Sequence, residues 1–296
     1  MKKNLLLIIF FISNIITAQT FYGTGAGQTG GNTNSYFGVK AGQVANGDHN
    51  TLIGYVSGSS LTSGHRNTFI GSNSGLSTTT GVENVFLGVS TGVYNQDGSY
   101  NTLIGRYAGK QNISGNRNVF LGYRTGSYNK GSNNVFIGTE AGSNEKGSNK
   151  FYLDNTNTAT PLLYGDFSTN QLGINTNNIP AGYAFAIKGK AIAEEIKVQL
   201  QSAWPDYVFE DKYDLITLKE VEAYIKSHGH LPEVPNATEV KASDGIELGE
   251  INTILLKKIE ELTLYTIEQH KEIKRLKKLE ERLEKIEELL ENTNLN

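Results

Sequence analysis

Between residues 31 and 153, short apolar runs alternate with longer polar, glycine-rich stretches at a nearly constant interval. Each unit reads as an asparagine, a variable residue, two mainly apolar or aromatic residues, and then a glycine. The repeated residues are Asn34, Asn50, Asn67, Asn84, Asn101, Asn118 and Asn134, and Gly38, Gly54, Gly71, Gly88, Gly105, Gly122 and Gly138. The asparagines are 16 or 17 residues apart, and a degenerate copy at Asn149 lacks the glycine. This fixed period predicts a stacked solenoid.

One apolar pair in each unit, such as Leu52 and Ile53, cannot be buried by that unit alone, so neighbouring units must share a core. The run is short and bounded by asparagine and glycine, which favours a strand over a helix. Glycines at fixed places suit corners that need positive φ or a close backbone approach. Asparagines in register can form a hydrogen-bonded ladder between units. We therefore expect a β-solenoid.

The repeat resembles the head repeat of trimeric autotransporter adhesins, although its period is longer than is usual there. The resemblance covers residues 31–153 and implies a left-handed β-roll in which three chains pack side by side. A monomeric β-solenoid stays open as the alternative.

Residues 154–200 lose the repeat but remain rich in short strand candidates. These candidates are Leu162–Gly165, Gln171–Asn175, Ala184–Ile187 and Ala191–Val198, separated by turn residues. We interpret this segment as a β neck.

Residues 201–240 predict a small α/β collar. Tyr207–Phe209 is a strand candidate. Thr217 and Glu220 form a capping box at the start of a helix, and Gly229 is placed to end that helix.

Residues 241–296 predict one long helix, which a capping box of Asp244 and Glu247 would start. A heptad pattern places apolar residues along one stripe, interrupted by Lys258 and Glu272. The broad stripe suits a three-stranded coiled coil, and a polar residue within it could set the register. The residues expected to mediate trimerisation are Leu248, Ile251, Leu255, Leu262, Gln269, Leu276, Leu283 and Leu290. A single amphipathic helix lying on another domain is the alternative.

The C-terminal part also resembles the end of secreted tail-fibre-domain proteins of Gram-negative bacteria, and more distantly the intramolecular chaperone of phage endosialidases. The phrases that carry the resemblance are Trp204–Phe209, Gly229–Pro235, Gly245–Asn252 and Leu255–Leu262. It implies a chaperone-like role in bringing three chains into register.

The phage-type chaperones cleave themselves at a serine followed by Asp and then a lysine. Here Ser243 and Asp244 are present, but Glu247 and Leu248 stand where the lysine would fall. Without a neighbouring base the serine has no activator, so we expect no cleavage.

The N-terminus predicts export. Residues 1–18 have a basic start, an apolar stretch and a small-residue cleavage site, which are typical of a signal peptide, and residues 19–30 predict a flexible leader. The chain has no cysteine, a net charge of −3 and no later apolar stretch of membrane-spanning length. We expect an extracellular or cell-surface protein of a Gram-negative bacterium with no integral membrane segment after signal removal. Scattered basic residues argue against nucleic-acid binding.

No motif predicts catalysis, a cofactor or a metal. His228 and His230 could bind a metal but fit a helix end equally well. Tyrosines outside the apolar pairs could stack on sugars or anchor a protein receptor; these are Tyr55, Tyr94, Tyr100, Tyr107, Tyr123 and Tyr128.

Taken together, the patterns predict a non-enzymatic homotrimeric fibre or adhesin, with a glycan or an extracellular protein as receptor. The alternatives are a tail-fibre-like component of a phage-derived apparatus, or a self-cleaving fibre with a chaperone domain.

Overall fold

The computed structural model describes residues 20–23, 25–27, 32–199 and 204–294. The predicted signal peptide, residues 1–18, lies outside the described residues, as does much of the leader. The chain divides into two compact units, Met1–Ile192 and Ala193–Asn296.

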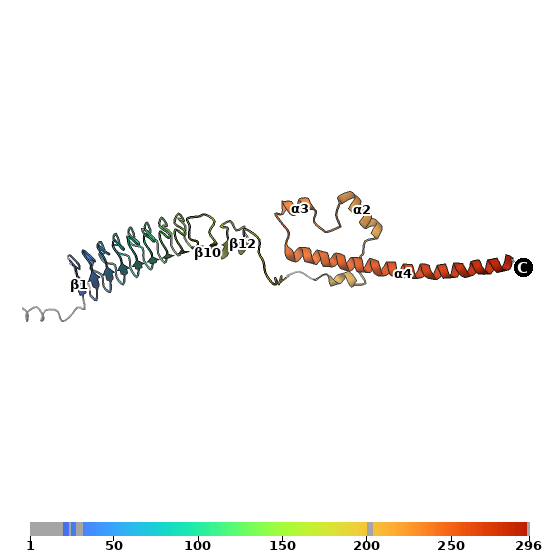
Figure 1. Ribbon diagram of the computed structural model, residues 1–296, viewed down its shortest axis with the longest axis horizontal. Coiled ribbons are helices and arrows are strands. Elements are labelled where there is room, and N and C mark those ends of the chain that lie inside the picture. Colours follow the sequence, from blue (N-terminus) through green and yellow to red (C-terminus); the bar gives the residue numbers. More distant parts are fainter. Residues whose placement is uncertain (1–19, 24, 28–31, 200–203, 295–296) are drawn as a thin grey trace, which may run out of the picture. The chain divides into compact units, whose positions relative to one another are not determined.

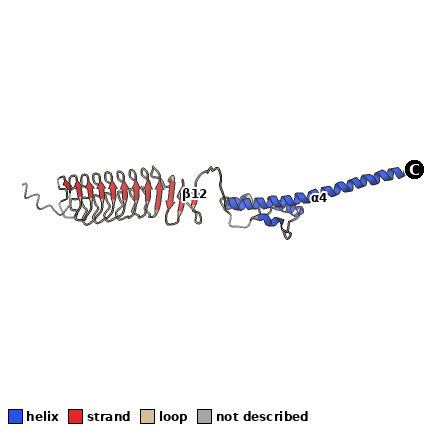
Figure 2. Ribbon diagram, turned by 90° about the horizontal axis from the view of Figure 1, so that it is seen from below, coloured by secondary structure: helices blue, strands red, loops and turns tan. Residues whose placement is uncertain are grey.

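The first unit is a β-solenoid built on a 12-stranded sheet whose strands follow one another in sequence order (Figures 1 and 2). The first nine strands pair in parallel with their neighbours. These strands are β1 (Thr20–Tyr22), β2 (Ser35–Phe37), β3 (Thr51–Ile53), β4 (Thr68–Ile70), β5 (Val85–Leu87), β6 (Thr102–Ile104), β7 (Val119–Leu121), β8 (Val135–Ile137) and β9 (Lys150–Leu153). The predicted solenoid is thus confirmed.

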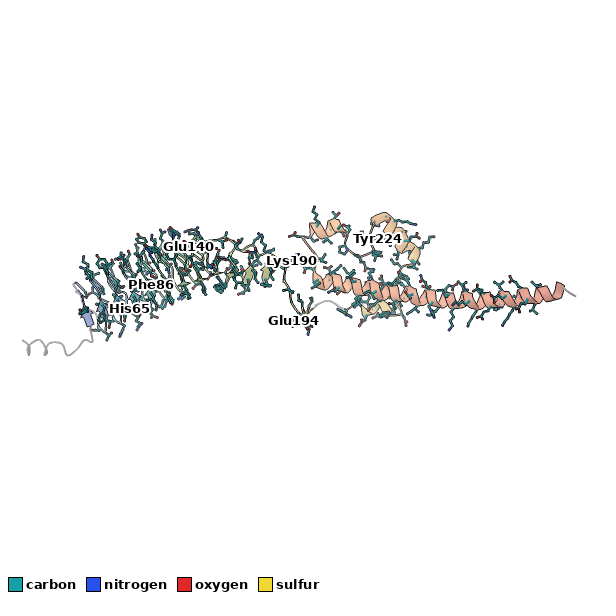
Figure 3. All side chains as sticks on the ribbon, in the orientation of Figure 1. His65, Phe86, Glu140, Lys190, Glu194 and Tyr224 are labelled. Atoms are coloured by element: carbon teal, nitrogen blue, oxygen red, sulfur yellow. The ribbon has the colours of Figure 1, made fainter. Side chains whose placement is uncertain are left out.

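Each of β2–β8 places its middle residue inside the coil, while its two neighbours point outward. The inner residues form one apolar column, which includes Phe86 (Figure 3). Phe86 stacks on Phe69 of the preceding coil, with the ring centroids 4.6 Å apart. The expectation that both residues of each apolar pair enter the core was wrong. Side chains alternate along a strand, so only the first of the two can point inward.

The sheet continues beyond the repeats through β10 (Leu163–Asp166), β11 (Gln171–Ile174) and β12 (Phe185–Ile187). Strand β10 is antiparallel to both β9 and β11, and β12 is parallel to β11. The strand expected at Ala191–Val198 does not form, and its residues are exposed. The predicted neck therefore extends the sheet of the coils.

The second unit is helical, with η1 (Pro205–Phe209), α2 (Leu218–His228), α3 (Ala237–Ala242) and the 47-residue α4 (Leu248–Asn294). The described residues of 204–240 contain no strand, which corrects the α/β collar. A 3₁₀ helix replaces the strand expected at Tyr207–Phe209, since Pro205 at its first position favours a helical start.

The sequence predicted some of the helix caps in this unit correctly and others wrongly. The Thr217 and Glu220 capping box is confirmed, as is Gly229, which ends α2 at a φ of 77°. The box expected at Asp244 was wrong, because Asp244 has a φ of 57° and precedes the first residue of α4 by several positions. An unpredicted box, made by Asn236 and Glu239, starts α3.

A left-handed backbone recurs in each coil at a position that is not glycine. Two residues after the repeat glycine the φ angle lies between 50° and 62°. The residues at this position are Lys40, Val56, Asn73, Ser90, Tyr107, Arg124 and Glu140. A β-branched side chain is least tolerant of this conformation, whereas asparagine adopts it readily.

Substitution of Val56 by Asn should therefore stabilise the solenoid by about 1 kcal/mol, since the φ of 50° suits asparagine better. The reverse change in the next coil, Asn73→Val, should destabilise it by a similar amount. Urea unfolding measures both. A Val56→Asn variant that is less stable than the parent would contradict the strain that we assign to this position.

Candidate interaction surfaces

The seven repeat asparagines are buried inside the coils and bond one coil to the next. Asn84 Nδ2 donates to Asn67 Oδ1 at 3.1 Å and to the Gly98 carbonyl at 2.9 Å. Its Oδ1 accepts from the backbone N–H and the Nδ2 of Asn101, at 2.9 and 3.1 Å. The predicted ladder is confirmed, and no repeat asparagine is available to a ligand.

The repeat glycines lie where the backbones of adjacent coils come closest. Gly54 has a φ of 134°, and a Cβ there would lie 2.4 Å from the Gly71 carbonyl oxygen. A second column of glycines, three residues before the asparagines and including Gly64, is crowded in the same way, since a Cβ there would lie 2.4 Å from the Gly81 oxygen. The close backbone approach expected at two glycines in each unit is confirmed. These glycines are structural residues.

The outward residues of the strands form two columns on the outer face of the sheet, one apolar and one in which valines mix with threonines. Val85, Leu87, Val119 and Leu121 are each 40–45% exposed. In-register pairing places Leu87, Ile104 and Leu121 in one apolar row, whereas Val85 and Val119 are separated by Thr102. A flat row of half-exposed apolar side chains of this kind is a candidate protein contact surface.

The candidate tyrosines lie on different sides of the coils. Tyr100 lies under the Arg117 guanidinium, on the side of the coils where the strands begin. Tyr107 and Tyr123 pack edge to face beyond the ends of the strands, with their centroids 6.5 Å apart. Sequence analysis missed the basic side chains around this pair; their recurrence near tyrosines at 94–128 was the available signal.

The heptad residues all lie on α4, and their stripe is largely uncovered by this chain. Leu262 is 62% exposed, and Leu276, Leu283 and Leu290 are each more than half exposed. The helices α2 and α3 lie beside only the first part of α4 (Figure 1). An isolated helix with such a leucine stripe gains its stability from a partner.

The interruption of the heptad at Lys258 has a local cause. Its ammonium group pairs with Glu233 at 3.3 Å and with Glu261 at 2.9 Å, and its side chain is only 13% exposed. The neighbouring Lys257 also pairs with Glu233, at 2.6 Å. This face of α4 therefore contacts the segment between α2 and α3, and Leu255 and Ile259, 47% and 60% exposed, continue the exposed stripe.

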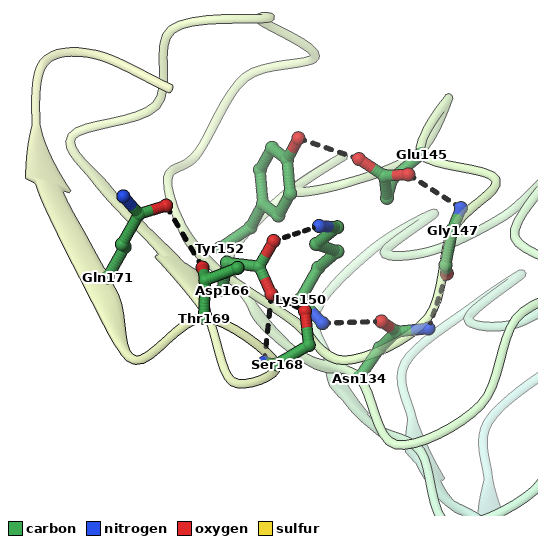
Figure 4. Close-up of polar contacts among 9 residues, drawn as sticks. All are labelled: Asn134, Glu145, Gly147, Lys150, Tyr152, Asp166, Ser168, Thr169 and Gln171. Atoms are coloured by element: carbon green, nitrogen blue, oxygen red, sulfur yellow. Dashed lines mark hydrogen bonds and ion pairs between the residues drawn. The ribbon is translucent and has the colours of Figure 1, made fainter. Parts of the chain in front are cut away.

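A cluster of polar contacts lies where the repeats meet β10 (Figure 4). Lys150 Nζ is 2.5 Å from Asp166 Oδ2, and the backbone N–H of Ser168 donates to Asp166 Oδ1. Tyr152 donates its hydroxyl to Glu145 at 2.9 Å. Lys150 and the backbone and hydroxyl of Ser168 stabilise the charged form of Asp166, and they outweigh the opposing effect of desolvation to lower its pKa to about 2. The charged groups of this cluster all have polar partners, so the cluster offers no free acid or base.

The remaining candidates lie apart from any such cluster. His228 and His230 both pack against Tyr224 on the exposed end of α2. Ser243 is the C-cap of α3. Among the described residues, no three His, Asp or Glu side chains converge as a metal site, and no helix is long and apolar enough to cross a membrane.

Replacing Asn84 by Ala should destabilise the protein by roughly 3–5 kcal/mol, because buried groups on both adjacent coils lose their partners. Thr80→Ala, at an exposed turn of the neighbouring coil, is the matched control and should change the stability by less than about 0.5 kcal/mol. Urea unfolding compares the two variants. Equal losses would contradict the ladder as the main bond between coils.

The Asp166 ion pair should stabilise the protein in a pH-dependent way, which the substitution of Asp166 by Asn tests. Because folding lowers the pKa of Asp166 from 3.8 to about 2, its contribution is present above pH 4 and is lost as the pH falls towards 2. After allowance for screening by solvent, we expect a loss of about 1–2 kcal/mol at pH 7. Urea midpoints of the two proteins should converge near pH 2, and a constant gap would contradict the assignment.

Comparison with known protein families, with characterised proteins and with solved structures finds no match to this chain. The features that the structure offers for an interaction are an apolar column on the outer face of the β-solenoid and an exposed leucine stripe on a long helix.

Proposed function

We propose that the chain is an exported, non-enzymatic fibre or adhesin that works as a homotrimer. The observation that carries this proposal is the leucine stripe of α4, which stays exposed along most of a 47-residue helix. The same helix of another copy is the simplest partner for a stripe that can pack against itself. The broad stripe, with isoleucines beside the leucines, favours three strands over two.

The solenoid supports the same proposal. Its outer face adds a half-exposed apolar column that a second copy can cover laterally. Its interior is filled by a column of buried side chains, and the outward-facing residues are the part that a partner can contact. In this proposal the C-terminal helix sets the register of the three chains.

The self-association is tested in the full chain by the double variant Leu262→Ser and Leu276→Ser. Burying one leucine contributes about 1.5–3 kcal/mol, and a trimer would bury three copies of each, so association should weaken by at least roughly 100-fold. Lys274→Ser, on the polar side of the same helix, is the control and should leave the mass unchanged. Sedimentation equilibrium measures the mass, and a parent protein that is monomeric at micromolar concentration would contradict the proposal.

A further inference from the structure

An edge of three consecutive coils carries interleaved aromatic and basic side chains. They follow strands β5, β6 and β7 in the chain. We name as the tyrosine–arginine strip the six residues Tyr94, Arg106, Tyr107, Lys110, Tyr123 and Arg124.

The backbone fixes the strip from coil to coil. The backbone N–H of Tyr94 donates to the Lys110 carbonyl at 3.1 Å, and the N–H of Arg124 donates to the Arg106 carbonyl at 2.9 Å. The side chains therefore rise from a rigid base, and a ligand would meet them already arranged.

Rings and cations alternate within the strip. The Arg106 guanidinium lies 4.7 Å from the centre of the Tyr107 ring. Lys110 Nζ lies between two rings, 5.4 Å from the centre of Tyr107 and 5.9 Å from that of Tyr94. Tyr94 and Tyr123 are 47% and 41% exposed, so part of each ring is open to solvent.

The positive charge of the strip is only partly neutralised. Arg124 pairs with Glu140 at 3.2 Å, whereas neither Arg106 nor Lys110 pairs with a carboxylate among the described residues. The pKa of the Tyr107 hydroxyl is lowered, chiefly by its hydrogen bond from Arg106 and also by the charges of Lys110 and Arg124. All three cations thus act at one point of the surface.

The fold does not require these residues. In the coil that contains β4, the positions equivalent to Tyr123, Tyr107 and Lys110 hold Ser72, Asn73 and Leu76. That coil has the same strand, the same glycines and the same left-handed corner. The strip is therefore a feature of particular coils, superimposed on the repeat.

We propose that the tyrosine–arginine strip binds an acidic polysaccharide. Tyrosine faces stack on sugar rings, and the uncompensated guanidinium and ammonium groups bind the carboxylate or sulfate groups of the sugar. Adjacent coils repeat every 4.8 Å or so, a spacing comparable to the length of one sugar unit in a chain. This inference rests on the proposed function in surface display, and it names the class of ligand that the displayed surface binds.

The test is calorimetric titration of the full chain with three sugars and one polypeptide: heparin oligosaccharides, oligogalacturonate, neutral dextran oligosaccharides and poly-glutamate. Heparin carries sulfates and carboxylates, and oligogalacturonate carries carboxylates only, so the pair identifies which acid group is bound. At least one of them should bind, with salt-dependent affinity, and dextran should not. Poly-glutamate tests whether an acidic protein would serve equally well.

Two double variants separate charge from stacking. Arg106→Gln with Lys110→Gln should weaken binding about tenfold or more by removing both free cations. Tyr107→Asn with Tyr123→Ser introduces the residues found at these positions in the β4 coil. It should weaken binding by a similar factor through loss of the rings. Arg117→Gln, which removes a cation stacked 5.6 Å from Tyr100 near the strand starts, is the matched control and should bind like the parent.

The proposal is overturned if neither acidic sugar binds, if Arg117→Gln weakens binding as much as the strip variants, or if poly-glutamate binds equally well and the tyrosine variant has no effect. The mass of each protein, measured in parallel, keeps the two proposals apart. A trimer that binds no acidic sugar contradicts the strip alone, and a monomer that binds through the strip contradicts the fibre alone.

Discussion

The contact of each coil with the next is the interaction on which the rest of the structure depends. A three-residue strand buries a single side chain, so no coil has a core of its own. The asparagine ladder and the in-register strands supply the missing contacts at every step. Because the glycines let the backbones approach so closely, nearly every polar group inside can reach its partner.

This arrangement separates the residues that build the coil from those that can serve a partner. The buried asparagine, the buried middle residue and the glycines leave the strand flanks and corners free to vary. Coils with the same interior can thus carry serine and asparagine at a corner in one place and tyrosine and arginine in another, as at Asn73 and Tyr107. We expect partner recognition to be found at such positions.

The sequence predicted the structure best where a position requires one residue type for a single steric or hydrogen-bonding reason. The repeat of Asn and Gly predicted the solenoid and its ladder, and Thr217 with Glu220 predicted a helix start. Prediction failed where local pattern is ambiguous: the aromatic run at Tyr207–Phe209 suits a strand, but it has no neighbouring strand and follows Pro205.

The interaction surfaces were harder to predict than the fold. The spacing of Lys258 in the heptad marked an interruption, but its pairing with Glu233 depends on a contact between residues 25 positions apart. Likewise, Arg106 and Lys110 stand near tyrosines in the sequence, but the contact of Lys110 with Tyr94 forms only when the coils stack. Which partner covers the leucine stripe of α4 is a property of more than one chain.

The central claim, that three copies join in parallel along α4, is tested most directly by pulsed electron paramagnetic resonance. The chain has no cysteine, so Lys274→Cys places one spin label on each copy. A parallel, in-register trimer predicts a dipolar signal with the modulation depth of three spins and one short distance, repeated with a label at Lys285. The absence of dipolar coupling at both positions would contradict the claim.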